Sequence, residues 1–463
     1  MIASSVRQLR PQGDSFEIAL FAFSDSEYET AIQLLSGNHS AKAVLLRARS
    51  FVRLGQFKRS VDELEAINFE SLGSGDGSEL MTLLSLAHVG LGTTDSVVGQ
   101  LTVGLTLACS IGSVVHEADV MFTTALYHYT GGQIDVASDE LYRLLGLTSV
   151  DSPWKKVEKT MQSLFEIRAR AYDLLGHIAA HNHQFAEQAN FIFLAFTELD
   201  KSDTCDSYVK AKILGNLAFV AADRDVEGVY EYVRDRAATA EFPGACQALE
   251  FEIRRNLGRC ASLHGDHVGA LREFRRSAEI APNRASKIKA LLDRSSLADE
   301  LNELVFANEE SDFALELTRQ VDWTTASSSE MFALLSMSQN LADRDPIEAR
   351  RLLNLFGVCK KRLNPFQSAA TDLGFTGREC QADALISRRE GNVDRAVQLN
   401  LDAFDLFKRV GYIGRAAIVA VELFELIGEY SYLEYTAAYS ARLPQSHLAR
   451  RVNEHLSAIS PNV

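Results

Sequence analysis

The chain has 463 residues, of which 46% are hydrophobic, and its 47 Lys and Arg against 62 Asp and Glu give a formal net charge of −15. This charge repels a phosphate backbone, so we expect no direct binding of nucleic acid by the chain. No run of about 18 apolar residues occurs, and a membrane-spanning helix is therefore not expected. The six cysteines are scattered without a CxxC pair, which predicts neither a disulfide framework nor a thiolate zinc site.

The N-terminal stretch is polar and contains Pro11 and Asp14, where a secretory signal peptide needs an unbroken apolar segment. The eight prolines and 28 glycines form no run long enough to act as a flexible linker. We therefore expect a cytoplasmic protein that folds as one continuous body over residues 1–463.

Apolar residues recur at spacings of three and four along the chain, which predicts helices rather than strands. Short turns join these helices in pairs, and the pairs share a skeleton of small residues, a turn glycine and large apolar residues. In chain order the pairs are marked by Ala48, Phe51, Gly55, Phe57 and Leu64; by Ala125, Gly132, Ile134, Ala137 and Leu141; by Leu175, Gly176, Phe185 and Ala195; by Leu214 and Gly215; by residues 252–283; and by Ala384, Gly391, Ala396 and Ala403, with Gly428 at the last turn.

The clearest pair is EIRRNLGRCASLHGDHVGALREFRRSAEIAPN, residues 252–283, which breaks at His264, Gly265 and Asp266. Its marker residues are Leu257, Gly258, Gly265, Ala270, Phe274, Ala278 and Pro282. The small side chains at 258 and 270 let the paired helices approach closely, and the aromatic ring at 274 fills the space between pairs. The proline at 282 ends the second helix.

This pair resembles a tetratricopeptide repeat (TPR), although Arg254 and Ala261 stand where that family usually has aromatic residues. The resemblance implies an all-α, right-handed α-solenoid of about ten TPR-like hairpins. It implies N-terminal hairpins in residues 1–150, the best-matching repeats in 151–310 and divergent hairpins in 311–463. With turns at Gly55, Gly132, His183, Gly265 and Gly391, the repeat averages roughly 40 residues rather than 34, which predicts longer helices and variable turns.

Residues 391–452 are similar to the sensor solenoids that precede a LuxR-type helix-turn-helix in bacterial regulators. After His447 and Arg451 the sequence stops at SAISPNV, which leaves no room for a helix-turn-helix of about 60 residues. We therefore expect any binding of DNA to come from a partner or from another portion of the protein.

Motifs that carry chemistry are few. His177 and His181 have metal-ligand spacing and His183 follows, but no Glu follows the first His, and we interpret the three as polar turn residues. GSGDG, residues 73–77, lacks the strand and the lysine of a phosphate-binding loop and is predicted to be a loop between helices. With no GxSxG elbow or GxGxxG loop either, the sequence predicts no enzyme, no cofactor and no metal.

The concave face of such a solenoid, lined by the first helices of successive hairpins, is the expected site for a protein or peptide partner. The register places these residues there: Asp173, His177, Lys212, Asn216, Arg255, Asn256 and Arg259. Arg49 and Arg53 form a second basic pair, which could equally be a solvated face.

Three of these residues, Lys212, Asn216 and Asn256, resemble positions of the carboxylate-clamp TPR proteins, which grip the C-terminal carboxylate of a peptide. The clamp also needs a further Lys and an Arg, and the sequence does not assign these two roles to Lys287, Lys289 or Arg294.

The only two tryptophans, Trp154 and Trp323, are either packing anchors or recognition residues.

Two functions remain open at this stage. The first is a scaffold or adaptor that binds a partner peptide or domain in its groove. The alternative is a regulatory module of a bacterial signalling or transcription system that senses a ligand or peptide. The oligomeric state is left open.

Overall fold

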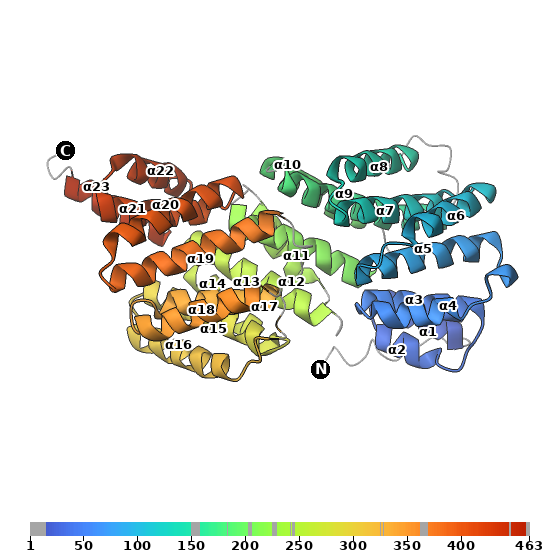
Figure 1. Ribbon diagram of the computed structural model, residues 1–463, viewed down its shortest axis with the longest axis horizontal. Helices are drawn as coiled ribbons and strands as arrows, with labels where there is room; N and C mark the ends of the chain where they lie inside the picture. Colours follow the sequence, from blue (N-terminus) through green and yellow to red (C-terminus); the bar gives the residue numbers. More distant parts are fainter. Residues whose placement is uncertain are drawn as a thin grey trace. The chain divides into compact units, whose positions relative to one another are not determined.

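The chain is seen here as a computed structural model. It describes residues 15–149, 158–182, 184–201, 206–224, 229–240, 242, 246–324, 326, 328–361, 369–443 and 446–459. These residues form 23 α-helices and no β-strand (Figure 1). The prediction of an all-α fold is confirmed.

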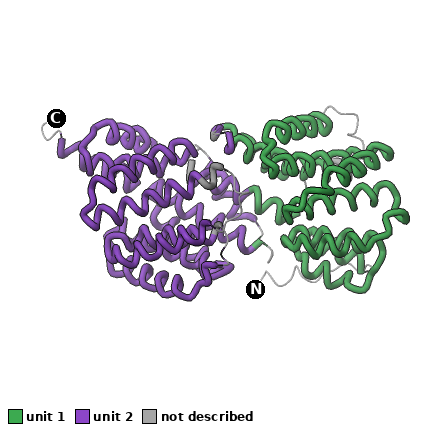
Figure 2. The backbone as a smooth tube through the Cα atoms, viewed as in Figure 1, with its two compact units in different colours: residues 1–179, 187–213, 241–246 green, residues 180–186, 214–240, 247–463 purple. Residues whose placement is uncertain are grey.

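The chain divides into two compact units, residues 1–179, 187–213 and 241–246 in unit 1 and the remainder in unit 2 (Figure 2). Unit 1 contains α1 (Ser15–Ser24), α2 (Tyr28–Leu34), α3 (Ala41–Arg53), α4 (Phe57–Glu65), α5 (Ser74–Leu91), α6 (Val97–Ser110), α7 (Val114–Thr130), α8 (Ile134–Leu147) and most of α9 (Glu158–His181) and α10 (Phe185–Leu199). Helix α11 (Ser207–Arg224) contributes residues 207–213 to unit 1 and 214–224 to unit 2. The expectation of one continuous body stays a prediction.

Unit 2 continues with α12 (Val229–Thr239), α13 (Gln247–Leu263), α14 (His267–Ile280), α15 (Arg284–Glu300), α16 (Leu304–Arg319), α17 (Ser328–Leu341), α18 (Pro346–Lys360), α19 (Ala369–Arg389), α20 (Val393–Arg409), α21 (Ile413–Ile427), α22 (Tyr430–Ser440) and α23 (His447–Ile459). Several first helices are long, and α9 has 24 residues and α19 has 21. These lengths explain the repeat of roughly 40 residues.

Each unit is built in two layers. The first helices of successive hairpins pack on one another, α3 on α5 and α5 on α7 in unit 1, and α13, α15, α17 and α19 in turn in unit 2. The second helix of each hairpin packs against its own first helix and against the first helix of the next hairpin, as α4 and α6 do. Such stacking buries a core that grows with each hairpin and leaves one layer of helices on the inside of any curve.

The α13/α14 hairpin shows why the sequence pattern works. A Cβ atom on Gly258 would lie 2.6 Å from the ring of Phe274, so only glycine lets α14 pack this closely. Gly265 has a φ of +77°, a conformation that favours glycine, and Asp266 accepts a hydrogen bond from the amide of Gly269 at the start of α14. This hairpin is confirmed as predicted.

The other predicted turns are largely confirmed. Gly55, Gly132 and Gly391 all have positive φ between paired helices. Gly428 also forms a turn, but α23 follows α22, so it is not the last one. His183 lies outside the described residues.

The prediction of a loop over residues 73–77 is wrong, because α5 begins at Ser74. Gly77 in its first turns lies against Leu107 and Phe69, where a Cβ atom would be 3.2 Å from Leu107 Cδ1. Close packing therefore favours glycine at position 77.

Within the described residues, no helix has the length and apolar content that crossing a bilayer requires.

Candidate partner-binding surface

In unit 1 the structure brings three of the predicted surface residues together. Asp173 on α9 is buried, with His177 Nε2 at 3.8 Å and Lys212 Nζ of α11 at 3.9 Å from its carboxylate. His177 is half-buried and Lys212 is exposed. The buried carboxylate thus brings His177 and Lys212 together on one surface.

The remaining predicted residues lie in unit 2, Asn216 on α11 and the others on α13. Arg255 contacts Asp293 of α15, with 2.5 Å between Nε and Oδ2. Arg259 donates a hydrogen bond of 3.2 Å to the side chain of the buried Asn256. Asn216 is half-buried. These side chains therefore take part in contacts between or along the first helices.

The cations considered for a carboxylate clamp also have internal contacts. Lys289 is only 3% exposed and lies 2.7 Å from Glu252. Arg294 lies 2.9 Å from Glu310, and the amine of Lys287 lies 6.0 Å from the centroid of the Phe313 ring. Removing a buried cation from its carboxylate is costly, so this geometry argues against a carboxylate clamp.

Electrostatics in this part of unit 2 reflect the same pairing. Burial alone would raise the pKa of Glu252, but Lys289 and Arg255 outweigh it and hold that pKa below its ordinary value. Burial lowers the pKa of Lys289, although Glu252 opposes the shift. The two groups act as one neutralised pair.

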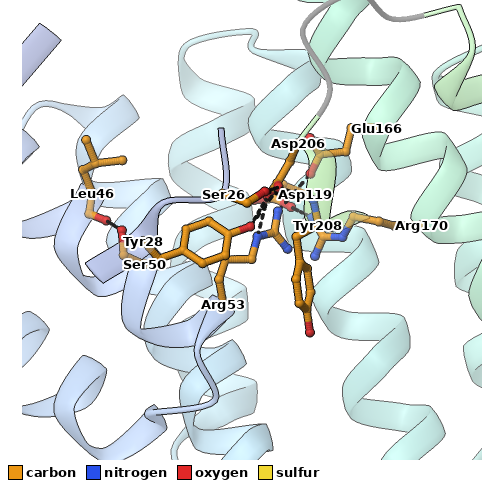
Figure 3. A network of polar contacts seen from close by, with 10 residues as sticks. All are labelled: Ser26, Tyr28, Leu46, Ser50, Arg53, Asp119, Glu166, Arg170, Asp206 and Tyr208. Carbon is orange, nitrogen blue, oxygen red and sulfur yellow. Dashed lines mark hydrogen bonds and ion pairs between the residues drawn. The ribbon is translucent and has the colours of Figure 1, made fainter. Parts of the chain in front are cut away.

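Unit 1 contains a cluster that the sequence indicated only through Arg49 and Arg53. Its seven charged residues come from the first helices α3, α5, α7 and α9 and from the residue before α11. We call it the inner charge cluster: Arg49, Arg53, Glu79, Asp119, Glu166, Arg170 and Asp206. Figure 3 shows most of its members converging.

Arg53 is the centre of this cluster. Its guanidinium lies 3.0 Å from Glu166 of α9 and 3.0 Å from Asp206. Burial disfavours the charged guanidinium, but the two carboxylates outweigh burial and raise the pKa of Arg53. Because Arg53 and Glu166 are 113 residues apart, the layer of first helices curves until α3 faces α9.

Flanking pairs complete the cluster. Arg49 contacts Glu79 of α5 at 2.6 Å, and Arg170 of α9 contacts Asp119 of α7 at 3.2 Å. Glu79 raises the pKa of Arg49, whereas burial lowers that of Arg170. Arg49 keeps 40% of its side chain exposed, so this cation reaches solvent from inside the curve.

Asp206 also binds the first hairpin, which consists of α1 and α2. Its carboxylate accepts hydrogen bonds from Ser26 Oγ at 3.0 Å and Tyr28 Oη at 2.8 Å, and from the amide of Tyr208 at 2.9 Å, which caps α11 (Figure 3). Burial, and then the charge of Asp206, raise the pKa of Tyr28, so its hydroxyl stays a donor. The two ends of unit 1 therefore meet at one carboxylate.

Sequence reasoning missed Ser26, Tyr28 and Asp206. A local signal existed for Asp206, since Asp before a helical pattern is a typical N-cap. Nothing local indicated that hydroxyls 178 and 180 residues away would share that carboxylate.

Contacts between neighbouring first helices follow the repeat. Arg255 and Asp293 are 38 residues apart, Lys289 and Glu252 are 37 apart, and Gln339 and Gln381 are 42 apart. Equivalent positions of successive hairpins thus face each other. Polar pairs at this spacing could have been found from the sequence alone.

Within each unit the described residues fold as stacked helical hairpins of the TPR-like kind.

No protein-family model and no curated protein matches it. Among solved structures it is similar to a Rap protein complexed with competence and sporulation factor, with 12% identity and a TM-score of 0.38 over 91% of this chain and 98% of the other. It is similar to the APC/C hetero-tetramer Cut9-Hcn1, with 13% identity and a TM-score of 0.31 over 94% and 95% of the two chains. It is also similar to yeast Tom70, with 13% identity and a TM-score of 0.37 over 95% of this chain and 98% of the other.

Among the described residues, no group of three or more His, Cys, Asp and Glu side chains is placed to hold a metal ion. The inner charge cluster joins three guanidinium groups to four carboxylates, and its bonds fix the positions of α3, α9 and α11. Of its members, Arg49 keeps the largest exposed fraction of its side chain, 40%.

Proposed function

We propose that the chain is a binding protein that holds a segment of a partner polypeptide against the first helices of unit 1. The observation that carries the proposal is the pair of long-range contacts made by Arg53 and Asp206, which fix the curved layer of first helices. A surface that is ordered before the partner arrives costs less to organise on binding. This arrangement supports action as a scaffold or adaptor.

Accessible groups on this surface fit a polypeptide segment that carries carboxylate and amide groups. Arg49 and Lys212 are cations that reach solvent, and His177 lies near Lys212 at the carboxylate of Asp173. Each can exchange part of its internal pairing for a contact with the partner, since pairs open to solvent are weak. Such contacts give specificity and speed of association more than affinity.

Site-specific photo-crosslinking tests the proposal. A photoreactive residue at Arg49 or Lys212 should trap a partner segment, whereas the same residue at Arg143, which is exposed on α8, should not. The trapped segment, synthesised and titrated against the pure protein, should bind saturably and lose affinity with Arg49→Glu. Equal trapping at all three positions would reject the inner surface as the site.

A second candidate is a regulatory module that senses a ligand or peptide. It is favoured by closure contacts within each unit, between Tyr28 and Asp206 in unit 1 and between the rings of Phe219 and Tyr412 in unit 2, whose centroids are 6.4 Å apart. A ligand that binds better when such a contact is open shifts the unit toward the open state. Faster hydrogen exchange at Tyr28 on adding the ligand would favour sensing, and unchanged exchange would favour the scaffold.

A further inference from the structure

A groove of about 860 Å³ lies on unit 2, where α12, α13 and α14 meet. Five arginines from the three helices line it: Arg234, Arg254, Arg272, Arg275 and Arg276. Three carboxylates line it as well, which leaves a local excess of two positive charges in a chain whose net charge is −15. No residue of the inner charge cluster is among those that line this groove.

Arg254 of α13 lines the groove with a side chain that is 19% exposed. It stands where the repeat pattern usually has an aromatic residue, so a guanidinium replaces a packing ring between α12 and α14. Its Nη2 donates to the carbonyl of Ala237 at 3.2 Å, and its Nη1 donates to Glu273 at 3.4 Å. The departure from the repeat pattern therefore makes the groove polar at this position.

Three arginines of α14, Arg272, Arg275 and Arg276, line the groove and are exposed to solvent, and we call them the rim arginines. The side chains of Arg272 and Arg276 are 69% and 50% exposed, and their nearest carboxylates, on Glu273 and Glu250, lie 3.4 and 3.5 Å away. Arg275 is exposed and has no ion pair with any residue that the structure describes. Exposed pairs of this kind are worth little to stability, so the rim cations are available to another anion.

Apolar side chains lie among these cations. Val268, in the first turn of α14, is 81% exposed, and Leu271 lines the groove one turn later. A branched apolar side chain surrounded by arginines offers an anchor for an apolar residue of a ligand.

We propose that this groove binds an acidic peptide segment of a partner protein, with carboxylates on the rim arginines and an apolar residue on Val268 and Leu271. Guanidinium groups bind carboxylates with paired hydrogen bonds, and the charge is opposite in sign. A nucleic acid fits less well, because the groove's own carboxylates and the charge of −15 repel a phosphate backbone.

The test is fluorescence anisotropy with a labelled octapeptide of glutamates and two leucines. We expect the full chain to bind it, and Arg272→Glu with Arg276→Glu to weaken binding by about tenfold or more. Arg143→Glu on α8 makes the same kind of charge change at an exposed site in unit 1 and should keep the affinity within about twofold. Arg275→Glu alone should weaken binding by a smaller factor.

Several results would overturn the proposal. Binding of the double variant with the affinity of the unchanged protein would be one such result, and equally tight binding of a peptide that has lysines in place of the glutamates would be another. Tighter binding of a single-stranded oligonucleotide than of the acidic peptide would reassign the groove to nucleic acid. Unchanged circular dichroism of the double variant shows that it is folded, and a failure here leaves the crosslinking result on unit 1 unaffected.

Discussion

Replacing Asp206 with alanine should unfold unit 1 more readily than almost any other single change in it. The side chain is only 4% exposed and binds Ser26, Tyr28, Arg53 and the amide of Tyr208. Loss of the N-cap costs about 1 kcal/mol. Two hydroxyl groups and a guanidinium also lose a buried acceptor, which brings the expected loss of unfolding free energy to about 3–5 kcal/mol.

Chemical unfolding measures the size of this loss, and hydrogen exchange read by mass spectrometry locates it. Exchange should accelerate in α1, α2 and the start of α11, while α15 to α19 stay as they are. Asp312→Ala is the control, because this carboxylate is mostly exposed and, among the residues that the structure describes, its ion pair is with Arg344 alone, so it should cost about 0.5 kcal/mol or less. A loss below about 1 kcal/mol for Asp206→Ala, or equal effects of the two variants, would refute the argument.

Three further predictions concern other parts of the chain. Gly258→Ala should cost about 2–3 kcal/mol in urea unfolding, because the new Cβ meets Phe274, whereas Gly99→Ala, with nothing within 4 Å, should stabilise by about 0.5–1 kcal/mol. Burial raises the pKa of Glu422 from 4.5 to about 7, so the folded protein favours the protonated side chain. The stability that this form contributes is fully present below about pH 4.5 and is lost as the pH rises through about 7. Glu422→Gln should therefore stabilise the protein by about 1–3 kcal/mol near pH 8 and change little near pH 4.5, as followed by thermal unfolding at both pH values. Trp323→Phe should cost about 1–2 kcal/mol by the same method, since the buried indole donates to the carbonyl of Thr318 at 3.0 Å.

Local packing rules were enough to predict the hairpins. Gly258, Phe274 and Gly265 act within one pair of helices, so their sequence pattern contains the structure that they form. The same reasoning failed at residues 73–77, because it treated glycines as loop formers. There the glycine at 77 is required by a close approach of Leu107 and Phe69, which come from other elements.

The candidate site was predicted only in part for a similar reason. Helix register placed Asp173, His177 and Lys212 on one surface, and the structure brings them together. The partners of Arg53 depend instead on the curvature of unit 1, which sums small rotations between hairpins. No local pattern encodes that sum, so the contact with Asp206 was not foreseeable.

The hydrogen bond between Tyr28 and Asp206 can form only after the ribosome has added both residues. The two residues are 178 positions apart. At about 5–20 residues per second, a ribosome needs roughly 10–35 s to add the acceptor after it has added the donor. During that interval the first hairpin has emerged without its buried carboxylate, and its exposed apolar face is open to chaperones or to another nascent chain.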